Sequence, residues 1–409
     1  MKKAMRILIV LILMWFVGYL MLVLAYSIPT GGMEVHVREA ASTFQKEGSY
    51  PQLAGMGTSQ LDNFTDALML LTASYPCDRN VWRAAVDAKR YHINGENPVK
   101  TLLNVYGEAK AAETVAYERY WHGYLIFLKP LLLFFSYTQI RYFFMAGQLF
   151  LFSLLIASLA ARKKELVIPT TFLWLFMNPM ATMCSLQFNS IIVVAFSAMI
   201  LIVVLNDIWK DDIDKWGLLF LCIGGVTSYL DLLTYPLVAL GAPLILFLSF
   251  RGTATMRSSM RYILTLSFFW VIGYAGMWAG KWILGSVITG EDIIGNAFAQ
   301  IQLRTSPFLS REHDKRTTFV MVIKKMLEYS WKYIMMSAIV ALSYVSVYKL
   351  RQIKRLKVKN ILPYAVIGIY PFGWYLASRN HSYIHAFFTY RELAITVYAI
   401  MVSAASCKD

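Results

Sequence analysis

The chain has 409 residues, of which 58% are hydrophobic and only 15% are charged. Soluble domains contain about 45–50% apolar and about 25% charged residues, so this composition excludes a soluble globular enzyme and a disordered chain. The 39 Lys and Arg residues outnumber the 24 Asp and Glu residues, which gives a formal net charge of +15. In a polytopic membrane protein such an excess marks cytoplasmic loops and contacts with membrane lipids, so we expect no nucleic acid partner.

Segments of about 20 apolar residues are long enough to cross a bilayer as helices. About ten segments approach this length, so we predict an all-α polytopic membrane protein with a single integral domain over residues 1–409. The candidate spans are Ile7–Ser27, Arg141–Ala161, Leu166–Thr182, Asn189–Leu205, Trp216–Leu230, Leu233–Phe250, Ile263–Gly285, Trp331–Tyr348, Ile361–Ala377 and Leu393–Ser406.

The distribution of basic residues predicts the orientation of these spans. Lys2, Lys3 and Arg6 precede the first span, and cytoplasmic segments are enriched in Lys and Arg, so we expect a cytoplasmic N-terminus. Alternating spans then leave Arg162–Lys164, the basic run Lys349–Lys359 and the C-terminus on the same side. The loop Asn206–Lys215 fits this rule poorly, because its Asp residues outnumber its Lys residues.

Three segments are expected on the outer side, at residues 28–140, 287–330 and 378–392. The first and largest follows the first span, and it begins with a predicted amphipathic helix, Met33–Tyr50, that ends at Gly48. A short apolar stretch at Tyr124–Phe135 is expected to lie in the membrane interface. The cytoplasmic loops are short, so we expect any chemistry at the outer face.

Several carboxylates in or near these outer segments are candidates for catalysis. Asp62 and Asp66 are four residues apart, which predicts one face of a helix, and neighbouring carboxylates can separate their pKa values so that one acts as a base. Glu34 lies close to the first span, and Asp231 stands in an apolar stretch where a carboxylate is costly. A solvent-exposed helix face or a helix cap explains Asp62, Asp66 and Asp231 without any chemistry.

Cations and ring side chains complete the predicted outer site. Arg391, Lys281 and Arg304 are candidates to bind a phosphate, for which the planar fork of Arg is well suited. Binding of sugar hydroxyls or stacking on a sugar face is predicted for Asp66, Asp231, His381, His385, Tyr390, His122 and Trp121. An interfacial aromatic belt with a snorkelling basic residue is the alternative for Arg391 and for Lys281.

This set of side chains suits a reaction on a lipid-linked phosphate, in which cations hold the phosphate and a carboxylate takes a proton from a hydroxyl nucleophile. No cofactor is indicated by a motif. A divalent metal, Mg²⁺ or Mn²⁺, stays open because several acids are present but no ligand set is specific, and we name no metal ligands.

Three stretches resemble the GT-C superfamily of integral-membrane glycosyltransferases. They are the helix MEVHVREAASTFQKEGSY after the first span, the stretch YWHGYLIFLKPLLLFFSYTQIRYFF with Arg141 and the later cluster Arg162–Lys164, and the last outer loop with His385, Tyr390 and Arg391. The resemblance covers most of the chain by topology, and it implies a large helical extracytoplasmic loop after the first helix.

The resemblance implies transfer of a sugar from a polyprenyl-phosphate donor to a glycan, lipid or surface-polymer acceptor. The family usually has an acidic residue, often an Asp-Glu pair, at the start of the first outer loop, whereas this chain has Met33-Glu34. The base is therefore Asp62 or Glu34. A transporter or flippase of lipid-linked saccharides and a polysaccharide polymerase or ligase are the rival functions, and we expect a bacterial plasma membrane location.

Overall fold

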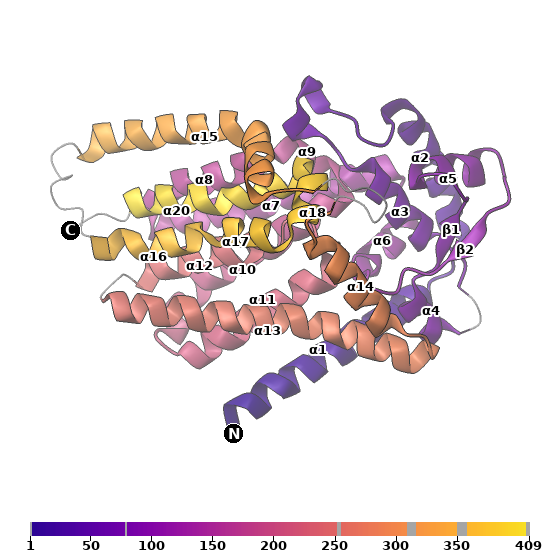
Figure 1. Ribbon diagram of the computed structural model, residues 1–409, viewed down its shortest axis with the longest axis horizontal. Helices are drawn as coiled ribbons and strands as arrows, with labels where there is room; N and C mark the ends of the chain where they lie inside the picture. The colour runs from indigo at the N-terminus through magenta and orange to yellow at the C-terminus, as the bar shows by residue number, and fades with distance from the viewer. Residues whose placement is uncertain (1, 78–79, 252–254, 309–315, 350–357, 406–409) are drawn as a thin grey trace.

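The computed structural model describes residues 2–77, 80–251, 255–308, 316–349 and 358–405 (Figure 1). The predicted basic run Lys349–Lys359 falls outside the residues whose side chains are described. The long helices run side by side, while the segment between α1 and α7 gathers at one end of this bundle, at the right of the figure. The structure is helical apart from one short antiparallel pair of strands, which confirms the all-α expectation.

Four helices in the described part of the chain are long and apolar enough to cross a membrane. They are α1 (Lys2–Tyr26), α7 (Tyr137–Arg162), α10 (Leu186–Trp209) and α13 (Met256–Thr289). The other expected spans are helical but shorter, interrupted or more polar, so the expectation of ten spans is confirmed only in part. These helices are η4 (Lys164–Leu166), α8 (Val167–Phe176), α9 (Pro179–Cys184), α11 (Ile213–Leu230), α12 (Val238–Arg251), α15 (Phe319–Lys349), α16 (Val358–Gly368), α17 (Tyr370–Ala377) and α20 (Ala394–Ala405).

Local backbone chemistry explains where the expected spans are interrupted. The span predicted at Leu166–Thr182 breaks where Asn178 adopts a left-handed conformation, with φ +59°, and caps α9 just before Pro179. The span predicted from Leu233 begins five residues later as α12, because Leu233 has φ +66° and Pro236 follows it. Hydropathy alone does not reveal these turns.

The segment after α1 folds into a helical cap with its own apolar core. The predicted amphipathic helix is confirmed as α2, which ends where Gly48 has φ +73°. The cap contains α2 (Gly31–Glu47), η1 (Leu53–Gly55), η2 (Gly57–Ser59), α3 (Asn63–Ala73), α4 (Val81–Asp87), β1 (Arg90–His92), α5 (Pro98–Leu102), η3 (Leu103–Gly107), β2 (Glu113–Val115) and α6 (Leu125–Leu132). Later short elements near the cap are α14 (Ile293–Thr305), α18 (Arg379–Ile384), α19 (Ala386–Thr389) and η6 (Tyr390–Leu393).

Helices α11 and α13 approach each other at two glycines. A Cβ atom on Gly224 would lie 2.1 Å from the Trp270 carbonyl oxygen, and a Cβ on Gly273 would lie 2.0 Å from that of Leu221. Both distances are impossible for a real side chain, so only glycine permits this contact. Small residues are the usual way for membrane helices to pack backbone against backbone.

The acidic loop between α10 and α11 forms ion pairs with several other helix ends. Asp214 pairs with Lys3 at 2.6 Å, and Asp207 pairs with Arg162 at 2.6 Å. Asp211 also lies 3.4 Å from the guanidinium of Arg251. These pairs are largely exposed, so each contributes little stability. They explain why an acidic loop lies beside three basic segments, and they bring these ends together at one end of the molecule.

Accessibility labelling tests the predicted orientation. In a variant without the native cysteines, Glu108→Cys in the cap should react with a membrane-impermeant maleimide on intact cells. Asp212→Cys in the acidic loop should react only after permeabilisation, because both side chains are exposed but lie at opposite ends of the bundle. The reverse labelling pattern would overturn the predicted topology.

Candidate functional site

Asp66 joins the cap to the membrane helices. Its fully buried carboxylate accepts hydrogen bonds from the backbone N–H groups of Leu186 at 3.1 Å and Gln187 at 3.2 Å, and from the Ser185 hydroxyl at 3.2 Å. A carboxylate is favourable here, because the first N–H groups of α10 lack helical partners and the helix dipole is positive at this end. Asp66 therefore stabilises the start of α10, and both of its carboxylate oxygens already accept hydrogen bonds.

Arg141 extends this connection to α2. It forms a two-point ion pair with Glu47, at 2.8 and 3.0 Å, and it donates to Asn63 Oδ1 at 2.9 Å. It also donates to the Tyr137 hydroxyl at 2.6 Å, and that hydroxyl donates to Asp66 at 2.7 Å. A continuous chain of polar contacts, which we call the Arg141 network, thus connects α2, α3, α7 and α10.

Asp62 and Asp66 have different roles despite their four-residue spacing. Asp62 is the N-cap of α3 and accepts from the backbone N–H of Thr65 at 3.1 Å and from its hydroxyl at 2.9 Å. Burial raises the pKa of Asp62 to about 7, against the lowering effect of the Thr65 bonds and with a smaller contribution from the Asp66 charge. No cation among the described residues forms an ion pair with Asp62.

Glu34, the second predicted base, lies far from Asp62. Asn63, the neighbour of Asp62, contacts Glu47 in the last turn of α2, whereas Glu34 lies in its first turn. The thirteen residues between the two glutamates correspond to about 20 Å along a helix. The structure therefore does not bring the two predicted bases together.

Two of the three predicted phosphate ligands are used in internal contacts. Arg391 is fully buried and donates to the carbonyl oxygens of Met177, Phe387 and Thr58, at 2.7, 3.0 and 3.4 Å. Lys281 is buried and donates to the carbonyl oxygen of Val86 at 2.7 Å. These bonds connect distant backbone segments, so both cations have a structural role.

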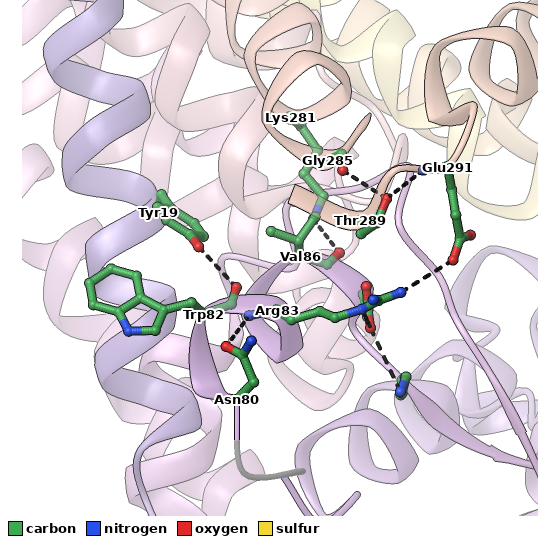
Figure 2. A network of polar contacts seen from close by, with 11 residues as sticks. Tyr19, Asn80, Trp82, Arg83, Val86, Lys281, Gly285, Thr289 and Glu291 are labelled. Carbon is green, nitrogen blue, oxygen red and sulfur yellow. Dashed lines mark hydrogen bonds and ion pairs between the residues drawn. The ribbon is translucent and has the colours of Figure 1, made fainter. Parts of the chain in front are cut away.

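Figure 2 shows how the contact of Lys281 belongs to a larger network around α4. The Tyr19 hydroxyl of α1 donates to the Trp82 carbonyl oxygen at 2.9 Å, and Arg83 lies 3.4 Å from Glu291 beyond the end of α13. Helix α4 is thereby held between α1 and α13 by contacts on both sides. This arrangement fixes the ends of α1 and α13 that lie beside the cap.

A different group of polar side chains gathers where α11 ends, which we call the outer cluster. It consists of Asp231, Arg304, His381, His385 and Glu392. Asp231 is the C-cap of α11 and accepts from the backbone N–H of Thr234 at 2.9 Å and from its hydroxyl. Burial raises the pKa of Asp231 to about 6, against the lowering effect of these bonds.

Glu392 is the second buried carboxyl of the outer cluster. Its Oε1 accepts from the backbone N–H of Leu237 at 3.1 Å, near the start of α12, whereas its Oε2 has no hydrogen-bond partner among the described residues. Burial raises the pKa of Glu392 well above its usual range, and the charge of Asp231 adds to this effect. Glu392 therefore has one carboxyl oxygen without a partner in the described part of the chain.

The two histidines of the outer cluster have opposite tautomers. Nε2 of His381 lies 2.8 Å from the Leu233 carbonyl oxygen, and because a carbonyl only accepts, this nitrogen carries the proton. Nδ1 of His381 is then an acceptor, and it has no partner in the described part of the chain. His385 accepts at Nε2 from Arg304 at 3.4 Å, and burial lowers the pKa of His385 to about 4, so it is neutral.

Arg304 differs from the other two predicted phosphate ligands. Its guanidinium is only half-buried, and its one hydrogen bond recorded within the described residues is the bond to His385. Burial raises the pKa of Tyr120, the charge of Arg304 lowers it, and the charge of Asp231 raises it further. Arg304 thus retains guanidinium donors for a ligand.

The remaining predicted sugar-binding residues have internal partners. The Trp121 indole donates to the Met277 carbonyl oxygen at 2.6 Å. The Tyr390 hydroxyl donates to the Thr58 carbonyl oxygen at 3.1 Å. His122 donates to the Tyr117 carbonyl oxygen at 2.8 Å and accepts from the Tyr124 hydroxyl at 2.9 Å. These side chains are buried and contribute to the packing of the cap.

Sequence reasoning did not identify Glu392 or Tyr120 as site residues. Glu392 directly precedes an apolar helix. Because a carboxylate beside a membrane span is energetically costly, the sequence could have marked Glu392 as a candidate site residue. Tyr120 gives no such signal, because its importance comes from neighbours on α11 and α14. No group of three or more His, Cys, Asp or Glu side chains within the described ranges is arranged to hold a metal ion.

Comparison with known proteins gives no relative for this chain. No protein-family model, no curated protein and no solved structure matches it.

The two aspartates of α3 provide a matched pair of stability variants. Asp66→Asn should lower the free energy of unfolding by about 3 kcal/mol, because the amide presents N–H groups to the buried donors that the carboxylate satisfied. Asp62→Asn should cost less than about 1 kcal/mol, since Asn is as good an N-cap as Asp. Thermal unfolding of the detergent-purified protein measures both, and equal losses would contradict the role given to Asp66.

Proposed function

We propose that this protein is an integral-membrane glycosyltransferase that moves a sugar from a polyprenyl-phosphate donor to a hydroxyl group of a glycan, lipid or surface-polymer acceptor. The reaction takes place at the outer cluster, on the side opposite the acidic loop. The observation that carries this proposal is a chain of contacts between Asp231 and Arg304. His381 donates to the carbonyl oxygen of Leu233, two residues after the buried Asp231, and its ring lies 4.8 Å from that of His385, which accepts from the half-buried Arg304.

We assign the base to Asp231 rather than to Asp62 or Glu34. The contacts of Asp62 are with Thr65 and do not lead to Arg304, and Glu34 lies at the far end of α2. Asp231 and Arg304 both lie close enough to Tyr120 to influence its hydroxyl. A base and a phosphate-binding cation must act on the same donor, so their proximity favours Asp231.

The proposed step needs few groups. The carboxylate of Asp231 accepts the proton of the acceptor hydroxyl as its oxygen bonds to the anomeric carbon of the sugar. The bond between that carbon and the phosphate oxygen breaks, and its electron pair stays on the phosphate, whose added charge the guanidinium of Arg304 stabilises. The products are the glycosylated acceptor and polyprenyl phosphate.

An apolar groove supports a donor with a long hydrocarbon chain. It has a volume of about 400 Å³ and lies between α1, α6, α11 and α13. It extends along α1 from Val10 to Met21 and includes Leu230, the chain neighbour of Asp231. Almost all of its lining is apolar, which suits an isoprenoid chain or the acyl chain of a lipid.

The assay for this function is consumption of synthetic polyprenyl-phosphate hexoses by purified, reconstituted protein with envelope glycan as acceptor. Because the pKa of Asp231 is about 6, the base is protonated in acid, and kcat should rise with pH and reach half of its maximum near pH 6. Asp231→Asn should lower kcat by a factor of about 100 or more and abolish this pH dependence, whereas Asp62→Asn should keep both. Wild-type kinetics in Asp231→Asn would contradict the assignment.

Arg304 has a separate test in the same assay. Arg304→Gln should lower kcat/KM for the donor by a factor of about 100, because a neutral side chain does not stabilise the charge that develops on the phosphate. Arg38→Gln, an exposed cation on α2, is the control and should have no effect. If the donor crosses vesicle membranes without being consumed, the protein is a flippase rather than a transferase.

A further inference from the structure

Four aromatic side chains follow one another along α13 at four-residue intervals. They are Trp270, Tyr274, Trp278 and Trp282, and their successive ring centroids are 4.8, 6.4 and 5.6 Å apart. Four residues turn a helix by about 400°, so each ring is displaced by about 40° around the axis from the one before. We call this set the aromatic row, and it winds around α13 instead of following one face.

The aromatic row leads from the outer surface to the outer cluster. At its outer end the Trp282 ring lies 6.1 Å from Phe298 on α14, whose side chain is 61% exposed. At its inner end Trp270 is buried and stacks on Tyr274, whose backbone N lies against Gly224 of α11, two turns before Asp231. Between them Trp278 meets Tyr120 edge to face at 4.9 Å.

Ordinary lipid contact does not account for the aromatic row. The exposed large apolar residues of α13 are Leu264, Phe268, Val271, Ile283 and Val287, at 69%, 61%, 51%, 43% and 78% exposure. Tyr274 and Trp278, by contrast, are half-buried, and Trp270 is buried. The row also covers twelve residues, about 18 Å of helix, which is deeper than an interfacial belt of aromatic side chains.

Polar atoms of the row and of the outer cluster indicate the chemistry of the ligand. Three buried atoms have no hydrogen-bond partner among the described residues: the Trp270 Nε1–H of the row, which donates, and two atoms of the outer cluster, His381 Nδ1, which accepts, and the carboxyl oxygen Oε2 of Glu392. A hydrocarbon chain would leave them unsatisfied. A sugar has apolar C–H faces, which stack on aromatic rings, and hydroxyl groups, which both donate and accept hydrogen bonds. It therefore fits the rings and the unpaired polar atoms together.

We propose that the aromatic row binds the acceptor of the reaction as an oligosaccharide, with its rings stacked on Trp282, Trp278 and Tyr274 and its terminal hydroxyl at Asp231. This inference rests on the proposed function for the identity of the acceptor. The binding of a saccharide to the row itself is independent of catalysis, and it is measured without any donor.

The experiment titrates the purified full-length protein in detergent with four hexasaccharides: β-1,4-linked glucose, β-1,4-linked N-acetylglucosamine, α-1,4-linked glucose and α-1,6-linked mannose. At least one should cause a saturable change in tryptophan fluorescence. Trp278→Ala and Tyr274→Ala should each weaken its binding about tenfold, because each removes one stacked ring. Trp331→Phe, at a 51% exposed position on α15, is the matched control and should bind like the wild type.

Arg304→Gln separates the inference from the proposed function. It should bind the saccharide with wild-type affinity, because Arg304 is assigned to the donor phosphate and not to the saccharide, although it transfers little sugar. Saccharide binding by a wild-type protein that consumes no donor would overturn the glycosyltransferase and leave the aromatic row as a saccharide site. No response to any of the four saccharides, or equal binding by the Trp278→Ala and wild-type proteins, would overturn the inference, and a native near-UV circular dichroism spectrum shows that a variant is folded.

Discussion

The bond between Asp66 and the first turn of α10 is the interaction on which the architecture depends. It joins a buried charge of the cap to the free N–H groups of a membrane helix, where no water is available to replace either partner. The Arg141 network continues this connection to α2 and α7, so four helices share one set of polar contacts. The cap is therefore held in a fixed orientation against the membrane helices.

The three predicted phosphate-binding cations differ in whether their donors are already used in internal contacts. Arg391 and Lys281 each donate to backbone carbonyls of distant segments, which replaces hydration for a cation buried at the membrane surface. Arg304 is only half-buried, on the short helix α14, and it contacts a neutral histidine rather than a carboxylate. Its charge is therefore not compensated by an ion pair within the described part of the chain, which is the property that an anion-binding residue needs.

Much of the fold follows from local rules, but the site does not. Apolar length and Lys/Arg positions predicted the long helices, and the helix-ending glycine at Gly48 predicted the end of α2. The spacing of Asp62 and Asp66 was identified correctly, but spacing along a helix does not reveal that one residue caps it while the other meets α10. The neighbours of Arg391 come from residues 58, 177 and 387, and no local pattern predicts such contacts. The burial of Asp231 was predictable from its apolar surroundings, whereas the contacts through His381 and His385 that connect its loop to Arg304 were not.

The glycine contact between α11 and α13 has a consequence for the site at its outer end. Gly224 lies two turns before Asp231, and Gly273 directly precedes Tyr274, so the backbone contact sets the offset along the helices between the Asp231 carboxyl and the half-buried Tyr274 ring. A methyl group at either glycine would force the two helices apart or past each other. In the proposed reaction, the spacing between the base and the acceptor would therefore depend on two glycines that contact neither group.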